Sequence, residues 1–149
     1  MDIQNVNNNG RVVKTEDYDN WVAPTKEEIL AKPTAELIAF IDTIDDDFNL
    51  LQDVYDNSPQ KKMREAAHRI IEKILPTYDF IDALLYNRHQ QDQLRQVLID
   101  LDDFEAQNNE RLDAYNGNNP EQFCFHNTIA ELIKARRFSI EQEIKELDV

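Results

Sequence analysis

The chain has 149 residues, of which 41% are hydrophobic and 31% are charged, and its 30 acids and 16 bases leave a net charge of −14. This length suits one domain with a substantial core, and the negative charge argues against direct binding to nucleic acid or to an anionic membrane surface. Two glycines are too few for a glycine-rich phosphate-binding loop, and one cysteine excludes an internal disulfide.

The first segment, residues 1–24, is polar, rich in asparagine and without helical periodicity. We therefore expect an extended N-terminal arm, followed by a single helical domain over 25–149. The apolar anchors of the arm are Tyr18, Trp21 and Val22. Because aromatic side chains contribute strongly to binding, we expect these three residues to contact a protein partner. The alternative is that Trp21 only fixes the arm to its own core.

Two helices are predicted after the arm. Thr25 and Glu28 form a capping box that opens a short helix, and Pro33 ends it. Thr34 then caps a long acidic helix over about 35–56. The apolar residues of this second helix are spaced four and three apart, as is typical of a helix packed against a partner helix. They are Leu37, Ile41, Ile44, Phe48, Leu51 and Tyr55.

The acidic stretch 45–56 places oxygen side chains at five positions that a calcium-binding loop would use. However, Leu50 stands where that loop needs glycine, Asp56 stands where it needs glutamate, and the apolar spacing is helical. We therefore expect a helix without metal, with residues 45–47 on its flanks and solvent side. The acidic surface that remains as an alternative binding site consists of Asp42, Asp45, Asp46, Asp53 and Asp56.

Ser58 as cap and Pro59 at the first helical position predict the start of a third helix, which runs to about Leu75. This helix is basic: residues 59–91 carry a net charge of +2, whereas residues 1–58 carry −9. Attraction between the two helices and their apolar stripes favours antiparallel pairing.

The second half of the chain continues the helical pattern. Pro76 is expected to break or kink the third helix, and residues 87–93, which include no apolar residue, are compatible with either a turn or a continuous helix. Gly117 closes a helix, and Asn119 with Pro120 opens the last one. The apolar stripe before this loop consists of Leu94, Leu98, Leu101, Phe104, Leu112 and Tyr115. The stripe of the last helix, about 121–147, consists of Phe125, Ile129, Leu132, Ile133, Ile140, Ile144 and Leu147.

Residue pairs that could bind metal or act as nucleophiles are incomplete. Glu65 and His68 have the spacing of ligands in two-iron bundles, but no second such pair exists. Cys124 and His126 would supply two of the four ligands of a zinc site, and side chains two apart on a helix diverge too far for a nucleophile pair. We therefore predict no enzymatic activity, no metal, no cofactor and no small-molecule substrate.

The fold class expected from these elements is all-α, a bundle of four to five helices behind the polar N-terminal arm. The leading hypothesis is a non-enzymatic component of a larger protein assembly, for example a minor virus-particle or phage protein, docked through the arm and one helical face. The alternative is an acidic inhibitor or nucleic-acid mimic that binds a basic groove on a host protein. The sequence shows no signal pattern and no membrane span, so we expect a cytoplasmic or particle-bound protein that is not secreted.

Overall fold

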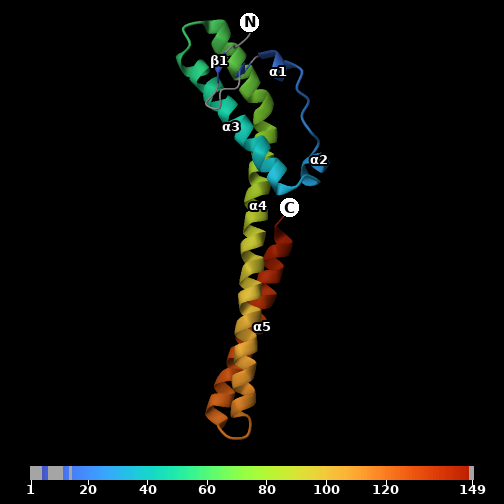
Figure 1. The fold of residues 1–149 in the computed structure, drawn as a ribbon, viewed down its shortest axis with the longest axis vertical. Coiled ribbons are helices and arrows are strands. Elements are labelled where there is room, and N and C mark those ends of the chain that lie inside the picture. Colours follow the sequence, from blue (N-terminus) through green and yellow to red (C-terminus); the bar gives the residue numbers. More distant parts are fainter. Residues whose placement is uncertain (1–4, 7–11, 14, 148–149) are drawn as a thin grey trace. The chain divides into compact units, whose positions relative to one another are not determined.

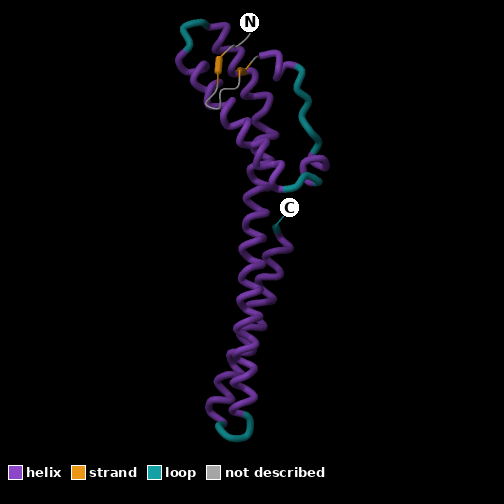
Figure 2. The backbone as a smooth tube through the Cα atoms, viewed as in Figure 1, coloured by secondary structure: helices purple, strands orange, loops and turns teal. Residues whose placement is uncertain are grey.

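The computed structural model describes residues 5–6, 12–13 and 15–147. Five helices lie within them: α1 (Thr15–Asp19), α2 (Lys26–Leu30), α3 (Thr34–Asn57), α4 (Lys61–Tyr115) and α5 (Pro120–Glu146) (Figure 1). Two strands of two residues, β1 (Asn5–Val6) and β2 (Val12–Val13), pair antiparallel, with Asn5 opposite Val13 and Val6 opposite Val12. Helix dominates the described backbone, which confirms the predicted all-α class (Figure 2).

The chain forms two compact units, residues 1–85 and 86–149. The first, here called the N-terminal unit, contains α1, α2, α3 and the beginning of α4. The second, here called the hairpin, contains the rest of α4 and the antiparallel α5. The predicted division into an arm (1–24) and one helical domain (25–149) does not coincide with this boundary and stays a prediction. Within the segment predicted to be extended, residues 15–19 form α1 instead.

The core of the N-terminal unit is formed where α3 packs antiparallel on α4. The later part of α3 and the start of α4 share one buried cluster, together with a residue of α1; it consists of Tyr18, Ile44, Leu51, Val54, Ala66, Ala67, Ile70 and Ile74. The start of α3 and a later part of α4 share a second cluster with α2, which consists of Ile29, Leu37, Ile41, Ile81 and Leu84. The order of these contacts confirms the predicted antiparallel pairing of the acidic and basic helices.

The buried line of α3 differs from the predicted stripe at its C-terminal half. Phe48 is only half-buried and Tyr55 is exposed, whereas Asp47 and Val54 take core positions. The expectation that residues 45–47 all face the flanks and solvent is therefore wrong for Asp47, which is 0% exposed. The cause is a third element: Tyr18 of α1 covers this flank of α3, and the spacing of α3 alone reports only the face toward α4.

Of the three helix starts predicted in the first half of the chain, only the one at Thr25 is confirmed. Thr25 caps α2, because its hydroxyl accepts a hydrogen bond from the Glu28 amide at 3.1 Å. Thr34, in contrast, is the first helical residue of α3 and not its cap, since Pro33 holds the cap position without a side-chain hydrogen bond. The predicted start of the third helix, with Ser58 as cap and Pro59 as first helical residue, is wrong as well: Ser58 caps the C-terminus of α3, and α4 begins only at Lys61.

The predicted interruption at Pro76 is absent, because α4 is helical from Lys61 through Pro76 to Tyr115. Proline removes one backbone donor, which would leave the carbonyl of Glu72 without its helical partner. Both Pro76 and Glu72 are exposed, so water can satisfy that carbonyl, while Ile74 and Ile81 on either side are anchored in the core. Packing on both sides thus compensates for the lost hydrogen bond.

Residues 87–93, which the sequence left open, form continuous helix. The reason is Gln91, which is buried and whose Nε2 donates to the carbonyl of Ile144 in α5 at 3.2 Å. Arg95 in turn donates to Gln91 Oε1 at 2.9 Å. A polar side chain with satisfied hydrogen bonds therefore packs this stretch against its neighbour.

The loop that joins α4 to α5 is as predicted. Gly117 has a φ of +79°, in the left-handed region that favours glycine. Asn119 caps α5, because its side-chain oxygen accepts from the Gln122 amide at 3.2 Å, and Pro120 is the first helical residue.

Candidate interaction surface

The three predicted anchors of the N-terminal segment differ in their surroundings. Tyr18 is buried in the first core cluster, and its hydroxyl donates a hydrogen bond to the buried carboxylate of Asp47. Trp21 is half-buried and packs against the same cluster. Only Val22, with 83% of its surface exposed, is free to meet another molecule. The alternative that this segment is fixed to its own core thus fits Tyr18 and Trp21 better than a role in partner contact.

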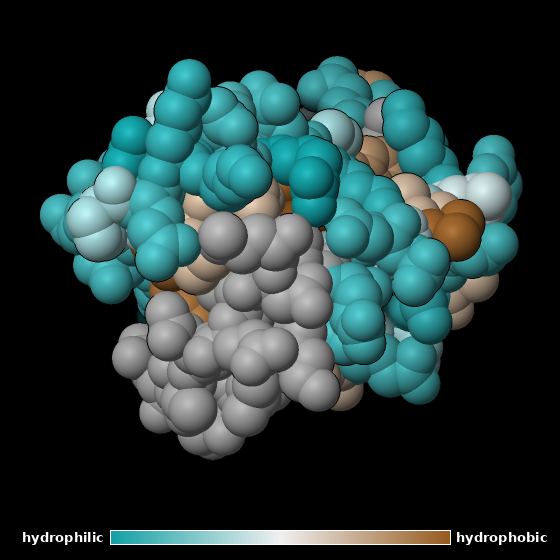
Figure 3. Space-filling model, turned by 90° about the horizontal axis from the view of Figure 1, so that it is seen from above, coloured by the Kyte–Doolittle hydropathy of each residue, from teal (hydrophilic) through white to brown (hydrophobic). Residues whose placement is uncertain are grey.

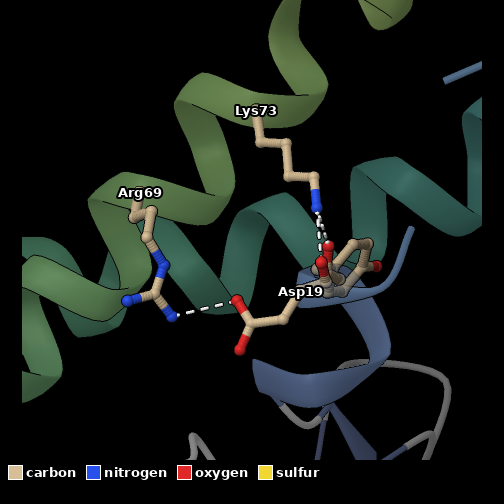
Figure 4. A network of polar contacts seen from close by, with 4 residues as sticks. Asp19, Arg69 and Lys73 are labelled. Atoms are coloured by element: carbon tan, nitrogen blue, oxygen red, sulfur yellow. Dashed lines mark hydrogen bonds and ion pairs between the residues drawn. The ribbon is translucent and has the colours of Figure 1, made fainter. Parts of the chain in front are cut away.

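Two basic residues of α4 hold α1 in place (Figure 4). The Nζ of Lys73 donates to the backbone carbonyls of Tyr18 and Asp19, at 2.6 and 2.9 Å. Arg69 donates to the carboxylate of Asp19 at 3.0 Å. The last carbonyls of a helix have no hydrogen-bond donors within it and carry partial negative charge. An ammonium group supplies both the donors and the opposite charge. Arg69 and Lys73 of the basic helix α4 are therefore engaged within the chain.

The Tyr18–Asp47 pair is the main feature that sequence reasoning missed. Buried aspartates are rare because desolvating a carboxylate is costly without compensating hydrogen bonds. Asp47 does lie three residues after Ile44 and four before Leu51, so its spacing fits the buried stripe. However, aspartate is usually exposed, so the residue type predicted a position in solvent. Its partner Tyr18 lies 29 residues earlier in the chain, too far for a local pattern to reveal.

The predicted acidic surface on α3 is only partly open. Asp42, Asp53 and Asp56 are exposed, whereas Asp45 and Asp46 are half-buried. The hydroxyl of Tyr78 donates to Asp45 at 2.6 Å. This hydrogen bond, together with partial burial and the negative charges of Asp45 and nearby aspartates, raises the pKa of Tyr78 to about 12. Asp45 therefore ties α3 to α4 rather than standing ready for a partner.

The stretch 45–56 lies inside α3, as the helical interpretation predicted, and so does not form a calcium loop. Within the part of the chain that the structure describes, no three His, Cys, Asp or Glu side chains are placed to hold a metal ion. The Nε2 of His68 lies 3.1 Å from the Oε1 of Glu72, and its ring stacks on that of Tyr55, with ring centroids 5.1 Å apart.

Cys124 and His126 have separate environments. Cys124 is exposed, whereas His126 is buried and lies opposite Asn108 of α4. The Nδ1 of His126 is 2.8 Å from Asn108 Oδ1, and Asn108 Nδ2 donates to the His126 carbonyl at 2.9 Å. Because the ring of Tyr115 also stacks on His126 at 5.7 Å, this histidine has a structural position between the two helices.

The hairpin has a thin core with a large polar share. Its buried residues among those described are Gln91, Asn108, His126, Ile133 and Ile140. Both buried apolar clusters belong to the N-terminal unit. Arg137 bridges the two helices, with its guanidinium 2.7 Å from Asp102 and 3.0 Å from Glu105, and the hydrogen bond to Glu105 raises the arginine pKa. Polar pairs thus fix which residues of α4 and α5 lie opposite one another.

Three apolar residues that the sequence predicted inside the packed stripes are exposed on the hairpin. Phe104, Phe125 and Leu132 show 50%, 58% and 64% of their surface. The prediction of an inward position is wrong for them, because two helices bury only the narrow stripe along which they touch. The stripes read from the sequence are wide enough for a bundle of more helices. Val97, Ile99 and Phe138 are exposed as well.

These exposed residues divide between two faces of the hairpin. Val97 comes directly before Leu98, and Phe104 directly before Glu105, which contacts Arg137 of α5. By helical geometry, Val97 and Phe104 lie on one flank of the contact line between the helices, and Phe125 and Leu132 lie on the same side of α5. They form one face, here called the apolar face. Ile99 and Phe138 lie on the opposite side, by the same helical geometry.

Polar residues dominate elsewhere on the visible surface: the end-on view of Figure 3 is largely hydrophilic, with apolar atoms only in small patches. None of the helices within the described ranges combines the length and apolar content needed to cross a bilayer.

Comparison of the chain with protein-family models, with curated proteins and with solved structures found no match, so the apolar face must be interpreted from its own geometry.

Proposed function

We propose that this chain is a non-enzymatic interaction protein, a component of a larger protein assembly that docks through the apolar face of the hairpin. The observation that carries the proposal is the exposure of Phe104, Phe125 and Leu132 on one face of a two-helix unit. Together with Val97, they expose about 400 Å² of apolar surface, if each side chain contributes roughly 100 Å². The largest apolar patch on a typical soluble protein has about this size and is often functional.

The proposal moves the docking site away from the N-terminal anchors. Tyr18 and Trp21 are engaged in the core of their own unit, and of the three only Val22 stays available. The virus-particle version of the hypothesis and the role of an acidic inhibitor both stay predictions. Salt separates the two kinds of docking, because apolar contacts resist it, whereas binding through Asp42, Asp53 and Asp56 would weaken steeply as salt screens the charges.

The test is to isolate the chain from its native source with whatever is attached, and to weigh the complex. Three forms are compared: the natural chain, Phe104→Gln with Leu132→Gln on the apolar face, and Ile99→Gln with Phe138→Gln on the opposite face. We expect the first double variant to lose its associated mass and the second to retain it. The proposal fails if the natural chain is free, or if both double variants retain the complex.

A further inference from the structure

We infer that the occupant of the apolar face is a second copy of this chain, so that two hairpins pair face to face into a four-helix bundle with α4 of each copy against α5 of the other. This inference rests on the proposed function and names its partner. It also accounts for the apolar stripes that are too wide for two helices, since a four-helix bundle buries a broader face of each helix.

Two hydrogen bonds between α4 and α5 set the level of each residue along the hairpin. Asn108 lies opposite His126, and Gln91 lies opposite Ile144. Phe104 lies four residues before Asn108 in α4, and Ala130 lies four residues after His126 in the antiparallel α5. Phe104 and Ala130 are therefore at the same level. Phe104 therefore lies between the levels of Phe125 and Leu132, and the three side chains form a compact apolar centre at the middle of the face.

The charges beside this centre favour a second copy. Asp100 of α4 and Arg136 of α5 lie on the apolar face by the same helical geometry, and their levels differ by about two residues, or roughly 3 Å. Both are exposed. A two-fold axis parallel to the helices places α4 of one copy beside α5 of the other, so Asp100 of each copy meets Arg136 of its partner. A face that carries both signs at matching levels is complementary to itself, as a two-fold interface requires.

The contacts of these two residues within one chain are weak. Asp100 accepts from Gln96 at 3.2 Å, and Arg136 lies 3.9 Å from Glu143. Both contacts join residues of the same helix and are exposed to solvent, where ion pairs and hydrogen bonds contribute little. Pairing with a second copy would therefore give Asp100 and Arg136 stronger partners without breaking a contact that holds the hairpin together.

The available area is sufficient for a stable dimer. The 27 residues of α5 span about 40 Å, and two helices side by side are roughly 20 Å wide. One face of the hairpin thus offers about 800 Å² per copy, the usual size of a specific interface. With an apolar centre and a polar rim, it also has the usual arrangement of such an interface.

The experiment is sedimentation equilibrium on the purified full chain at about 50 µM, well above a dissociation constant in the micromolar range. We expect twice the 17.5 kDa mass of one chain. Phe104→Gln with Leu132→Gln should weaken the dimer at least tenfold, whereas Ile99→Gln with Phe138→Gln should leave it intact. Circular dichroism checks that each variant retains its helix content, since all four positions are exposed.

A charge exchange tests the orientation. Arg136→Asp alone should weaken the dimer, and Asp100→Arg in the same chain should restore it, because the two signs are then swapped on both copies. The inference is overturned if the purified chain has the mass of one copy, if the opposite-face variant dissociates the dimer instead, or if Asp100→Arg worsens the effect of Arg136→Asp.

The two proposals fail in distinguishable ways. A purified chain that is monomeric, yet carries a partner in its native source that Phe104→Gln with Leu132→Gln removes, overturns the second-copy inference and leaves the proposed function standing. A chain that is monomeric in both settings overturns both.

Discussion

The N-terminal unit and the hairpin differ in how the apolar stripes of their helices are covered. In the first, α3 and α4 bury two apolar clusters, and α1 and α2 cover the remaining flanks with Tyr18 and Ile29. In the hairpin, the described residues form two helices without a further short element, and polar pairs such as Asn108 with His126 hold them together. The difference teaches that similar helical stripes produce a closed unit where short elements cover them and an open face where none does.

The largest effect on stability is expected from shortening a side chain in the core. Leu51 is fully buried in the first cluster, so Leu51→Ala should destabilise the N-terminal unit by about 3 kcal/mol through lost contacts and a cavity. The matched variant in the hairpin is Ile140→Ala. Hydrogen exchange should show faster amide exchange in residues 15–85 for the first variant and in 86–147 for the second. Equal acceleration in both units by either variant would mean that the chain unfolds as one body.

A smaller effect is expected from the polar tie that closes the N-terminal unit. Tyr18→Phe removes the hydroxyl that donates to the buried carboxylate of Asp47, and should cost about 2 kcal/mol in the free energy of unfolding. Tyr55→Phe is the control, because Tyr55 is exposed and its change should stay within about 0.5 kcal/mol. Urea denaturation measures both. If the two variants were equally stable, the Tyr18–Asp47 bond would contribute nothing.

The smallest effect depends on pH. The pKa of Tyr78 is raised from 10.0 to about 12 by its hydrogen bond to Asp45, so this contact stabilises the fold fully below pH 10 and is lost as pH rises through about 12. Solvent screening keeps the contribution to less than about 1 kcal/mol. Tyr78→Phe should therefore make the loss of stability between pH 10 and 12 less steep in urea titrations. An unchanged slope would show that other groups govern alkaline unfolding.

Several local features of the fold could be predicted because their causes are local. A hydroxyl before the first turn, a glycine in the left-handed region and an asparagine followed by proline act within four residues, so Thr25, Gly117 and Asn119 were interpreted correctly. The helical period of the apolar residues likewise predicted α3 and its antiparallel partner. These features need no knowledge of distant residues.

The candidate surface could not be predicted in the same way. Periodicity places Phe104, Phe125 and Leu132 near a stripe, but the number of helices available to cover that stripe decides whether they are buried. Proline at position 76 predicts a break, but packing on both sides of it retains the helix. Each of these outcomes depends on neighbours supplied by the rest of the fold.

The sequence by itself determined the all-α class, the helical nature of α3 and α5, the loop between α4 and α5 and the excess of negative charge, because these follow from backbone geometry and from side chains close along the chain. Tertiary structure alone decided that Asp47 is buried, that Tyr18 serves the core and that the hairpin exposes an apolar face. Burial is a property of the space around a residue, and contacts between segments far apart in the chain fill or leave that space.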